Sequence, residues 1–286
     1  MLPYDGITRT GSKGVSHFVT KTPSEGARYW KAKIKASRSP LQFVERAGCA
    51  CYTASGHITT QQGDRGMNNV ELARFNMVEQ QIRPWDVLDM DVLDLIKKVK
   101  REHFVPADKQ SLAFMDVEIP LGHDATMWSP KLEARALQAL KLKRSDRVLE
   151  VGTGSGYLTA LLSRMAEHVT SIELVPELSA RAARNLAAHH FDNVTLEVGD
   201  ASVPAKGWGS EKYDAIVLTA SVPLPPESFY QMLNAGGRLF AIVGDAPAMQ
   251  ARLVTCVAPG VFETTTLFET DVAPLTNAPQ PQRFVF

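Results

Sequence analysis

The chain has 286 residues, of which 44% are hydrophobic and 22% charged, and its formal net charge is zero. This length and composition allow one enzyme-sized domain with a buried core, and they exclude fibrous proteins and chains that are disordered throughout. The charge is uneven, because residues 1–66 hold 10 Lys and Arg against 4 Asp and Glu, which leaves the remainder acidic. An acidic domain argues against a nucleic-acid partner, since phosphate binding needs a basic face, and no apolar run is long enough to predict a membrane span.

Residues 1–66 differ in composition from everything that follows. They lack sustained hydrophobic periodicity and are rich in Gly, Ser, Thr, Lys and Arg, so they cannot bury enough surface to offset the entropy of ordering. We therefore expect a disordered N-terminal extension at 1–66 and a folded domain at 67–286. The extension contains no continuous apolar region of the kind that signal peptides have, whereas its basic, acid-poor composition leaves an organelle transit peptide open. The alternative is a natural start at Met67, with the preceding residues read through from upstream.

The three cysteines indicate no disulfide framework. Cys49 and Cys51 lie in the extension, and Cys256 lies in the expected domain. A reducing compartment is the default for such a chain, so we expect a cytoplasmic protein. Cys49 and Cys51 together with His57 match no zinc-ligand spacing, and we therefore expect no metal site.

Two helices are predicted at the start of the domain. Apolar residues recur at helical spacing over residues 70–82 and again over 86–99, and Pro84 separates the two runs. Asp86 is the expected N-cap of the second helix. The apolar stripe expected on that helix comprises Leu88, Val92, Leu95, Ile96 and Val99.

Beyond these helices the pattern changes to an alternation of helices and strands. Residues 111–130 first form an irregular or extended crossing segment, because Pro120, Gly122 and Pro130 break regular structure, and loops of this length usually carry function. The expected helices then span 131–140, 155–166, 176–189 and 226–233. The expected strands begin at 147, 168 and 194 and span 213–219 and 237–243, followed by β-rich runs at 251–257 and 262–268. This alternation predicts an α/β fold, in which helices cover both faces of a mainly parallel sheet.

A glycine-rich turn follows the first expected strand of this alternation. Gly152 and Gly154 can adopt backbone angles closed to other residues and let a ligand approach the main chain. The spacing is G-x-G-x-G, and no Lys-Ser/Thr pair follows, so the turn fits neither a dinucleotide nor a phosphate loop. Glu150 just before the turn would repel an anion. A ligand with a cationic amino acid end and an adenosine end, such as S-adenosylmethionine, fits this pattern.

The next two strands also end in acids. Glu173 follows the strand that begins at 168, about twenty residues beyond the turn, where a carboxylate binds ribose hydroxyls in doubly wound nucleotide sites. Asp200 ends the third strand, and its carboxylate could accept a hydrogen bond from the adenine amino group. The alternative for Asp200 is a cap on the following turn. Three acids at three successive strand ends support one cofactor site.

With these strand ends in view, the chain resembles the protein-L-isoaspartate O-methyltransferase family over residues 67–286. The stretch 148–157, with Thr, Ser and Tyr between and after its glycines, is close to the family's cofactor motif. Further similar stretches are 104–106, 119–122, 192–194, 213–216, 236–239 and 283–285. The resemblance implies a Rossmann-like, doubly wound, seven-stranded methyltransferase sheet with N-terminal helices. It also implies S-adenosyl-L-methionine as cofactor and isoaspartyl-containing proteins or peptides as substrate in protein repair, and we expect a monomer.

The resemblance assigns the site residues position by position. The expected cofactor-binding residues are Glu150, Gly152, Thr153, Gly154, Ser155, Gly156, Glu173, Leu174, Asp200 and Ala201. In the crossing segment, family members carry Gly-Gln-Thr-Ile-Ser-Gln-Pro, whose Thr and Ser help hold the substrate carboxylate. This chain has Asp-Ala-Thr-Met-Trp-Ser-Pro at 124–130, so Thr126 matches and Trp128 replaces the Ser. Thr126 and Ser129 are the expected catalytic residues, although Ser129 before Pro130 is also a good N-cap.

The expected reaction asks for positioning more than for acid–base chemistry. A carboxylate is ionised at neutral pH and can attack the sulfonium methyl without a general base. His123 could act as a base toward another nucleophile, but a lone loop histidine is more often a solvated surface residue.

Two other functions stay open at this level. One is a methyltransferase that acts on a nucleobase amine or another small molecule. Amine-directed enzymes usually carry Asn/Asp-Pro-Pro-aromatic after the fourth strand, where this chain has Leu-Thr-Ala-Ser-Val-Pro at 218–223, which lowers that alternative. The other is a non-catalytic relative that binds the cofactor and has lost methyl transfer through Trp128.

Overall fold

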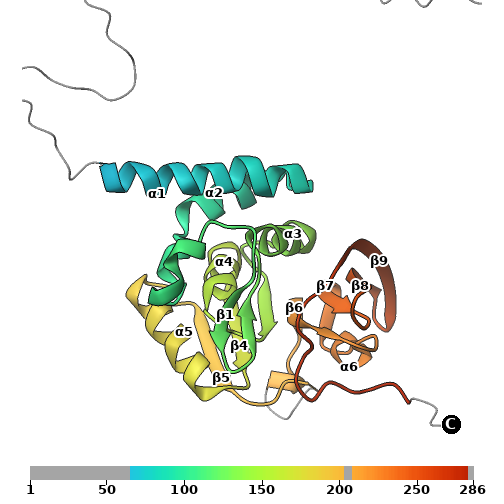
Figure 1. Ribbon diagram of the computed structural model, residues 1–286. Coiled ribbons are helices and arrows are strands. Elements are labelled where there is room, and N and C mark those ends of the chain that lie inside the picture. Colours follow the sequence, from blue (N-terminus) through green and yellow to red (C-terminus); the bar gives the residue numbers. More distant parts are fainter. Residues whose placement is uncertain (1–64, 203–207, 283–286) are drawn as a thin grey trace, which may run out of the picture. The chain divides into compact units, whose positions relative to one another are not determined.

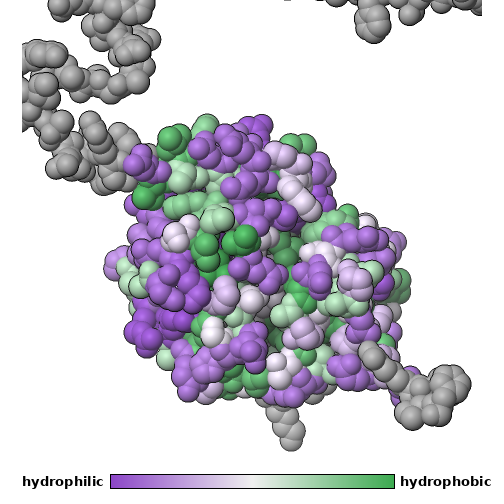
Figure 2. All heavy atoms as spheres, viewed as in Figure 1, coloured by the Kyte–Doolittle hydropathy of each residue, from purple (hydrophilic) through white to green (hydrophobic). Residues whose placement is uncertain are grey.

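The structure is a computed structural model, and it describes residues 65–202 and 208–282 (Figure 1). Nearly all of the predicted extension, with Cys49, Cys51 and His57, lies outside these ranges, so its disorder and the boundary at residue 66 stay predictions. Within the described ranges, no helix has the length and apolarity needed to cross a membrane. On the face shown in Figure 2, apolar side chains are interspersed with polar ones.

A seven-stranded sheet forms the centre of the described part of the chain. Its strands are β3 (Arg147–Val151), β4 (His168–Glu173), β5 (Val194–Val198), β6 (Tyr213–Val222), β7 (Leu233–Val243), β8 (Met249–Ala258) and β9 (Val261–Thr270). The spatial order is β5-β4-β3-β6-β7-β8-β9. The first five strands of this order run parallel, and β8 and β9 are antiparallel to their neighbours. The predicted mainly parallel α/β sheet is therefore confirmed.

Strand β3 is buried on both faces of the sheet, and its successive apolar residues point to opposite sides. Val148 belongs to a core cluster with residues of helices α3 (Pro130–Leu140), α4 (Tyr157–Met165) and α5 (Pro176–Ala188). Leu149 belongs to a second cluster, which includes Phe229 of the short helix α6. Helix α6 (Glu227–Tyr230) is shorter than predicted, because β7 already begins at Leu233.

The N-terminal helices differ in detail from the prediction. Helix α1 (Arg65–Asn76) continues into a π-helical segment (Met77–Ile82) and a 3₁₀ turn (Arg83–Trp85), which confirms the helix predicted over 70–82. Helix α2 (Met90–Lys98) begins later than predicted.

The predicted N-cap Asp86 is wrong, and so is Leu88 as part of the apolar stripe. Asp86 ends the preceding turn in the left-handed conformation. The cap is Asp89, whose side chain accepts from the backbone N–H groups of Asp91 and Val92. Because the helix starts after it, Leu88 lies outside the periodic face and is 66% exposed.

The crossing segment is more regular than expected. After 3₁₀ turns at Arg101–His103 and Ala107–Leu112, it contains strands β1 (Ile119–Gly122) and β2 (Ala125–Met127), which pair antiparallel. Gly122, His123 and Asp124 all have positive φ in the turn between these strands. This hairpin contains Thr126, one of the two expected catalytic residues. A further 3₁₀ turn, Trp208–Ser210, precedes β6.

Candidate active site

A cavity of about 320 Å³ lies where β3, β4, β5 and β6 end. In open α/β sheets, ligands bind at the carboxyl ends of the strands, and a volume of this order suits a small molecule. The wall contains the glycine turn at 151–155, the ends of β4 and β5 at 172–175 and 199–202, and the hairpin residues 123–128. The glycine turn and the hairpin that contains the expected catalytic residue Thr126 therefore line one cavity.

The glycine turn has a shape that side chains would prevent. Gly152, Gly154 and Gly156 have φ values of 95°, 54° and 82°. A Cβ atom on Gly152 would lie 2.1 Å from Oγ1 of Thr219 in β6. That hydroxyl donates to the carbonyl oxygens of Val151 and Gly152, at 2.8 and 2.9 Å, so the neighbouring strand fixes the turn. The bare backbone faces the cavity, which fits a ligand that contacts the main chain closely.

Glu173 lines the cavity and also stabilises the turn. Its Oε2 accepts from the backbone N–H of Gly154 at 2.8 Å, and its Oε1 accepts from that of Val175 at 3.1 Å. The carboxylate is thereby held between two elements, and its remaining lone pairs are available to hydroxyl donors. This arrangement is compatible with ribose binding, and that role stays a prediction.

Asp200 combines both of the roles considered for it. One oxygen accepts from the backbone N–H of Ser202 at 2.9 Å, as a turn cap does, and the residue also lines the cavity. The Ser202 N–H lowers the pKa of the Asp200 carboxyl, so the group is held ionised. Its second oxygen accepts from Asn277 at 2.8 Å.

Glu150 does not line the cavity. Its carboxyl is fully buried beneath the glycine turn, where Oε2 accepts from the hydroxyls of Thr159 and Ser171, while Oε1 has no hydrogen-bond partner. Burial is the main cause that raises the pKa of Glu150 to about 8, and the two hydroxyls oppose it. The structure thus places Glu150 as a support for the turn, since the strand directs its side chain into the core and not toward the ligand side.

The acceptor loop brings Thr126 to the cavity but not Ser129. Thr126 lines the cavity, and its hydroxyl donates to Glu118 at 2.9 Å. The hydroxyl proton is therefore engaged by Glu118 and not by a methyl-accepting substrate. Ser129 is buried at the N-cap position of α3, and its side chain makes no capping hydrogen bond. Only its carbonyl accepts, from Leu132 and Glu133. Trp128 lies in the cavity wall and packs edge-on against Phe240 with ring centroids 6.1 Å apart.

A buried ion pair supports the same wall. Arg101 is fully buried, pairs with Glu133 and donates to the carbonyl oxygen of Trp128 at 2.6 Å. Glu133 lines the cavity, and burial raises the pKa of its carboxyl to about 7 against the opposing effect of Arg101. Its position on α3 gave a signal in the sequence, since Glu133 shares the apolar face with Leu137 and Leu140. The sequence analysis missed it.

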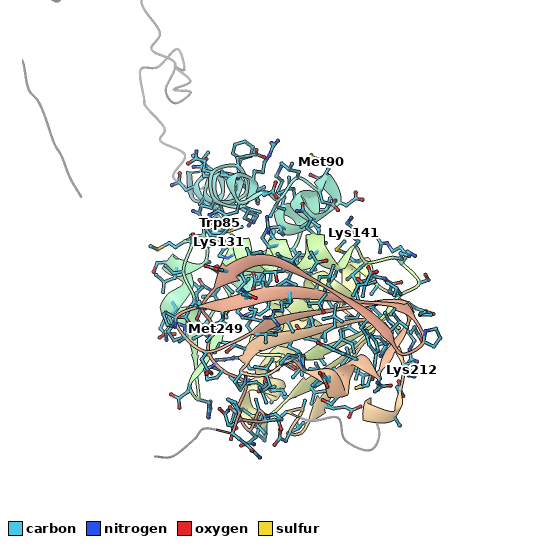
Figure 3. All side chains as sticks on the ribbon, turned by 90° about the vertical axis from the view of Figure 1, so that its right-hand side faces the viewer. Trp85, Met90, Lys131, Lys141, Lys212 and Met249 are labelled. Atoms are coloured by element: carbon cyan, nitrogen blue, oxygen red, sulfur yellow. The ribbon has the colours of Figure 1, made fainter. Side chains whose placement is uncertain are left out.

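Lys131, which follows the hairpin and Pro130, does not line the cavity. Lys131 pairs with Asp116 at 2.7 Å and lies 4.0 Å from the ring centroid of Trp85 (Figure 3). Among the residues that the structure describes, no lysine lines the cavity.

The structure collects most of the predicted site residues in one place. The cavity wall includes Gly152, Thr153, Gly154, Ser155, Glu173, Leu174, Asp200, Ala201 and Thr126. Glu150, Gly156 and Ser129 are not part of it. The wall also contains residues 273–276, whose segment returns across the sheet edge and bonds to Ser221 through Ala273 and Leu275. No local motif marks that segment, because its position depends on contacts with residues distant in the sequence.

Comparison with known proteins identifies the family. The model of the protein-L-isoaspartate (D-aspartate) O-methyltransferase (PCMT) family matches residues 73–279. The chain belongs to this family. It is therefore related to S-adenosylmethionine-dependent O-methyltransferases, as the sequence predicts.

Two curated relatives illustrate the level of similarity. The protein-L-isoaspartate O-methyltransferase of Opitutus terrae is 39% identical over 184 residues, which are 64% of this chain and 78% of the relative. That of Rhodopseudomonas palustris is 38% identical over 204 residues, which are 71% and 92%.

Solved structures of PCMT proteins share the fold. A chain described as a protein-L-isoaspartate O-methyltransferase from Plasmodium falciparum, in complex with S-adenosyl-L-homocysteine, superposes with a TM-score of 0.62 at 20% identity. The match covers 71% of this chain and 98% of that one. A second protein-L-isoaspartate O-methyltransferase superposes with a TM-score of 0.60 at 24% identity, over 72% and 65%. The predicted Rossmann-like methyltransferase fold is confirmed.

Proposed function

We propose that this chain transfers the methyl group of S-adenosylmethionine to the side-chain carboxylate of isoaspartyl residues in proteins or peptides. The observation that supports the proposal is that the glycine turn and the hairpin at 123–128 line the same cavity, in a member of the PCMT family. Esterification of such damaged sites is the step that protein repair needs. Activity as a monomer and a cytoplasmic location stay predictions.

Different parts of the cavity would bind different parts of the cofactor. When bound, S-adenosylmethionine supplies an electrophilic methyl group on a sulfonium. The turn at 152–155 would hold its amino acid end by main-chain contacts, and Glu173 and Asp200 would bind ribose and adenine. Both carboxylates are already fixed by backbone N–H donors, so little ordering is left for binding to accomplish.

Methyl transfer to a carboxylate forms a carbon–oxygen bond, breaks a sulfur–carbon bond and leaves a neutral thioether. Since no proton moves, the site needs no general base. Its task is to hold the carboxylate in line with the methyl group and to exclude water, which lowers the barrier by several kcal/mol. The positive charge of Arg101 offsets the charge of Glu133 when that carboxyl is ionised, so the pair does not repel an anionic acceptor.

The test uses the full chain with methyl-labelled S-adenosylmethionine, an isoaspartyl peptide and its normal aspartyl twin. We expect base-labile methyl ester on the isoaspartyl peptide alone, and Glu173→Ala should abolish most of it. Equal labelling of the two peptides would contradict the proposed selectivity.

A second candidate function is supported by one observation, the indole of Trp128 in the acceptor wall. It fills space that a peptide main chain would occupy. The chain would then act on a smaller acceptor or bind the cofactor without transfer. Tight binding of S-adenosylhomocysteine with no ester on either peptide would favour this candidate.

A further inference from the structure

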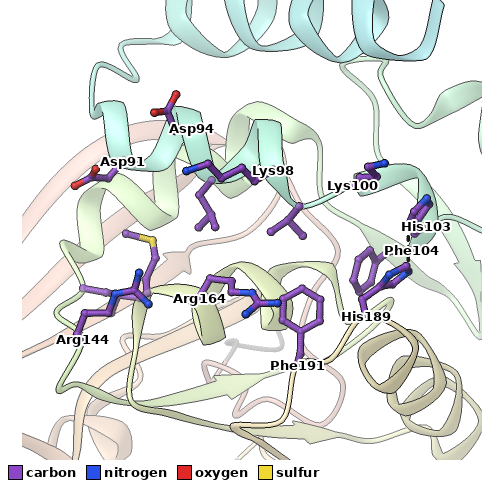
Figure 4. A pocket seen from close by; sticks show the side chains of 14 residues that line it. Asp91, Asp94, Lys98, Lys100, His103, Phe104, Arg144, Arg164, His189 and Phe191 are labelled. Atoms are coloured by element: carbon purple, nitrogen blue, oxygen red, sulfur yellow. Dashed lines mark hydrogen bonds between the residues drawn. The ribbon is translucent and has the colours of Figure 1, made fainter. Parts of the chain in front are cut away.

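A second and larger cavity lies at the opposite edge of the sheet from the candidate active site. It has a volume of about 820 Å³ (Figure 4). Its wall includes Leu142 and Arg144 just before β3 and residues 164–165 at the end of α4. Because helices of parallel α/β units run antiparallel to their strands, these segments mark the amino edge, whereas the cofactor turn follows the carboxyl end of β3. The two cavities share no lining residue.

Positive charge predominates in this amino-edge cavity. Lys98, Lys100, Arg144 and Arg164 line it, against two acids, Asp91 and Asp94. In Figure 4 both acids lie at one end of the cavity, on α2, and their carboxylates point away from Arg164. Among the ion pairs between described residues, none involves any of these four cations. Lys98, Arg144 and Arg164 are thus available to a ligand, whereas Lys100 also interacts with the charge of Glu71.

Aromatic rings form the far end of the cavity. The rings of His103 and His189 stack at 4.5 Å between centroids, and their nitrogens are hydrogen-bonded at 3.1 Å. Phe104 and Phe191 are buried beside them, with centroids 6.2 Å apart. The guanidinium of Arg164 lies 4.5 Å from the ring centroid of Phe191, which orients this cation at the boundary between the charged and the aromatic parts.

The environment of His189 disfavours its charged form. Burial lowers the pKa of His189, and His103, His190 and Lys100 lower it further through repulsion. A hydrogen bond between two imidazoles requires at least one neutral ring, so the pair is not a full dication. With four cations against two acids, the amino-edge cavity therefore has a local excess of positive charge.

The floor of the cavity is apolar. Leu95 and Val99 approach from the α2 side, and Leu142 and Met165 from the other. A ligand that satisfies the whole cavity must join a negative head to an apolar body. Phosphate and carboxylate heads match the planar donors of arginine, and a ring or short chain matches the floor and the aromatic end.

We propose that the amino-edge cavity binds a small organic anion, a phosphate or carboxylate attached to an aromatic or aliphatic group. The head meets Arg144, Arg164 and Lys98, and the apolar body lies on Leu95, Val99 and Met165. The site is independent of methyl transfer, since the two cavities are formed by opposite ends of the strands. Its occupancy can be measured without any substrate.

The test is calorimetry on the full chain with phenyl phosphate as probe, and with inorganic phosphate for comparison. We expect saturable binding of phenyl phosphate, weakened about tenfold or more in Arg144→Gln/Arg164→Gln, because two charge-assisted contacts are lost. The control Lys109→Gln/Arg252→Gln also removes two positive charges, but outside the cavity, and it should leave the affinity within about twofold. Inorganic phosphate should bind more weakly than phenyl phosphate, since it leaves the floor unused.

Three results would overturn the proposal. They are absence of saturable binding up to about 10 mM, equal loss in both double variants, and complete displacement of phenyl phosphate by S-adenosylhomocysteine. The last would place the probe in the cofactor cavity. Continued binding of S-adenosylhomocysteine by Arg144→Gln/Arg164→Gln shows that the variant is folded, and it separates failure of this proposal from failure of the proposed methyl transfer.

Discussion

Replacement of Glu150 by glutamine should change the pH dependence of stability. The Glu150 carboxyl is fully buried, and one of its oxygens has no partner. Its pKa rises from 4.5 to about 8, chiefly through burial; the hydroxyls of Ser171 and Thr159 lower it, and the charges of Glu173 and Glu133 raise it further. The group is therefore neutral in the folded protein under conditions in which the unfolded chain has released its proton.

The change of stability with pH follows from this difference in proton binding between the folded and the unfolded state. Above pH 4.5 the folded state retains a proton that the unfolded state loses, so stability falls as the pH rises, and the fall ends near pH 8. The slope is at most about 1.4 kcal/mol per pH unit, and the full interval corresponds to about 5 kcal/mol. A glutamine side chain in this place would not titrate. The Glu150→Gln variant should therefore gain stability relative to the wild type across this range.

The assay is urea unfolding of the wild type and Glu150→Gln between about pH 5 and about pH 8. Glu71→Gln is the matched control, because Glu71 is exposed and Arg74 lowers the pKa of its carboxyl, so it contributes no slope in this range. Parallel pH profiles for the wild type and Glu150→Gln would refute the argument. They would mean that the buried carboxyl is ionised and compensated in the folded protein.

Four further outcomes are expected. Glu173→Ala should weaken S-adenosylhomocysteine binding by about ten- to a hundredfold in calorimetry, because it removes ribose contacts and frees the Gly154 amide. Gly152→Ala should destabilise the domain by about 1–3 kcal/mol in urea unfolding, since the new Cβ would lie 2.1 Å from the Thr219 hydroxyl. A chain that begins at Met67 should keep its melting temperature within about two degrees in a thermal unfolding scan, because a solvated extension makes few contacts. Trp128→Ser with Ala125→Gln should raise turnover on an isoaspartyl peptide about tenfold, or about 1.4 kcal/mol of transition-state stabilisation.

The cofactor side of the site could be predicted because its residues sit at fixed places relative to local patterns. Strand, glycine turn and helix follow one another in the sequence, and parallel strands bring Glu173 and Asp200 to the same edge. The direction of a side chain is less well encoded. Glu150 lies one residue from Val151, which lines the cavity, yet it points into the core, since neighbouring residues of a strand alternate between faces.

The acceptor side could not be predicted to the same degree, because contacts distant in the sequence determine it. Arg101 reaches Trp128 and Glu133 from a turn about thirty residues earlier. The segment at 273–276 follows the last strand of the sheet and is held at the wall by hydrogen bonds to Ser221, about fifty residues earlier. Neither feature has a local periodicity or a short motif. The same applies to α2, where both Asp86 and Asp89 suit a cap and the preceding turn decides between them.

The contacts of Arg101 also determine what the Trp128 variants can reveal. Arg101 holds the backbone carbonyl of Trp128, so a change of side chain leaves the main anchor of the loop in place. The indole itself is 5% exposed and packs on Phe240, and truncation of such a side chain costs about 3–5 kcal/mol. Turnover of Trp128→Ser and of the double variant is therefore counted per molecule that still binds S-adenosylhomocysteine, because unfolding alone would lower it. Trp128→Phe keeps an aromatic ring against Phe240 and adds no hydroxyl, so it should leave turnover unchanged while Trp128→Ser/Ala125→Gln raises it. If Trp128→Phe and the double variant both lose turnover while remaining folded, the indole belongs to the acceptor site of this enzyme.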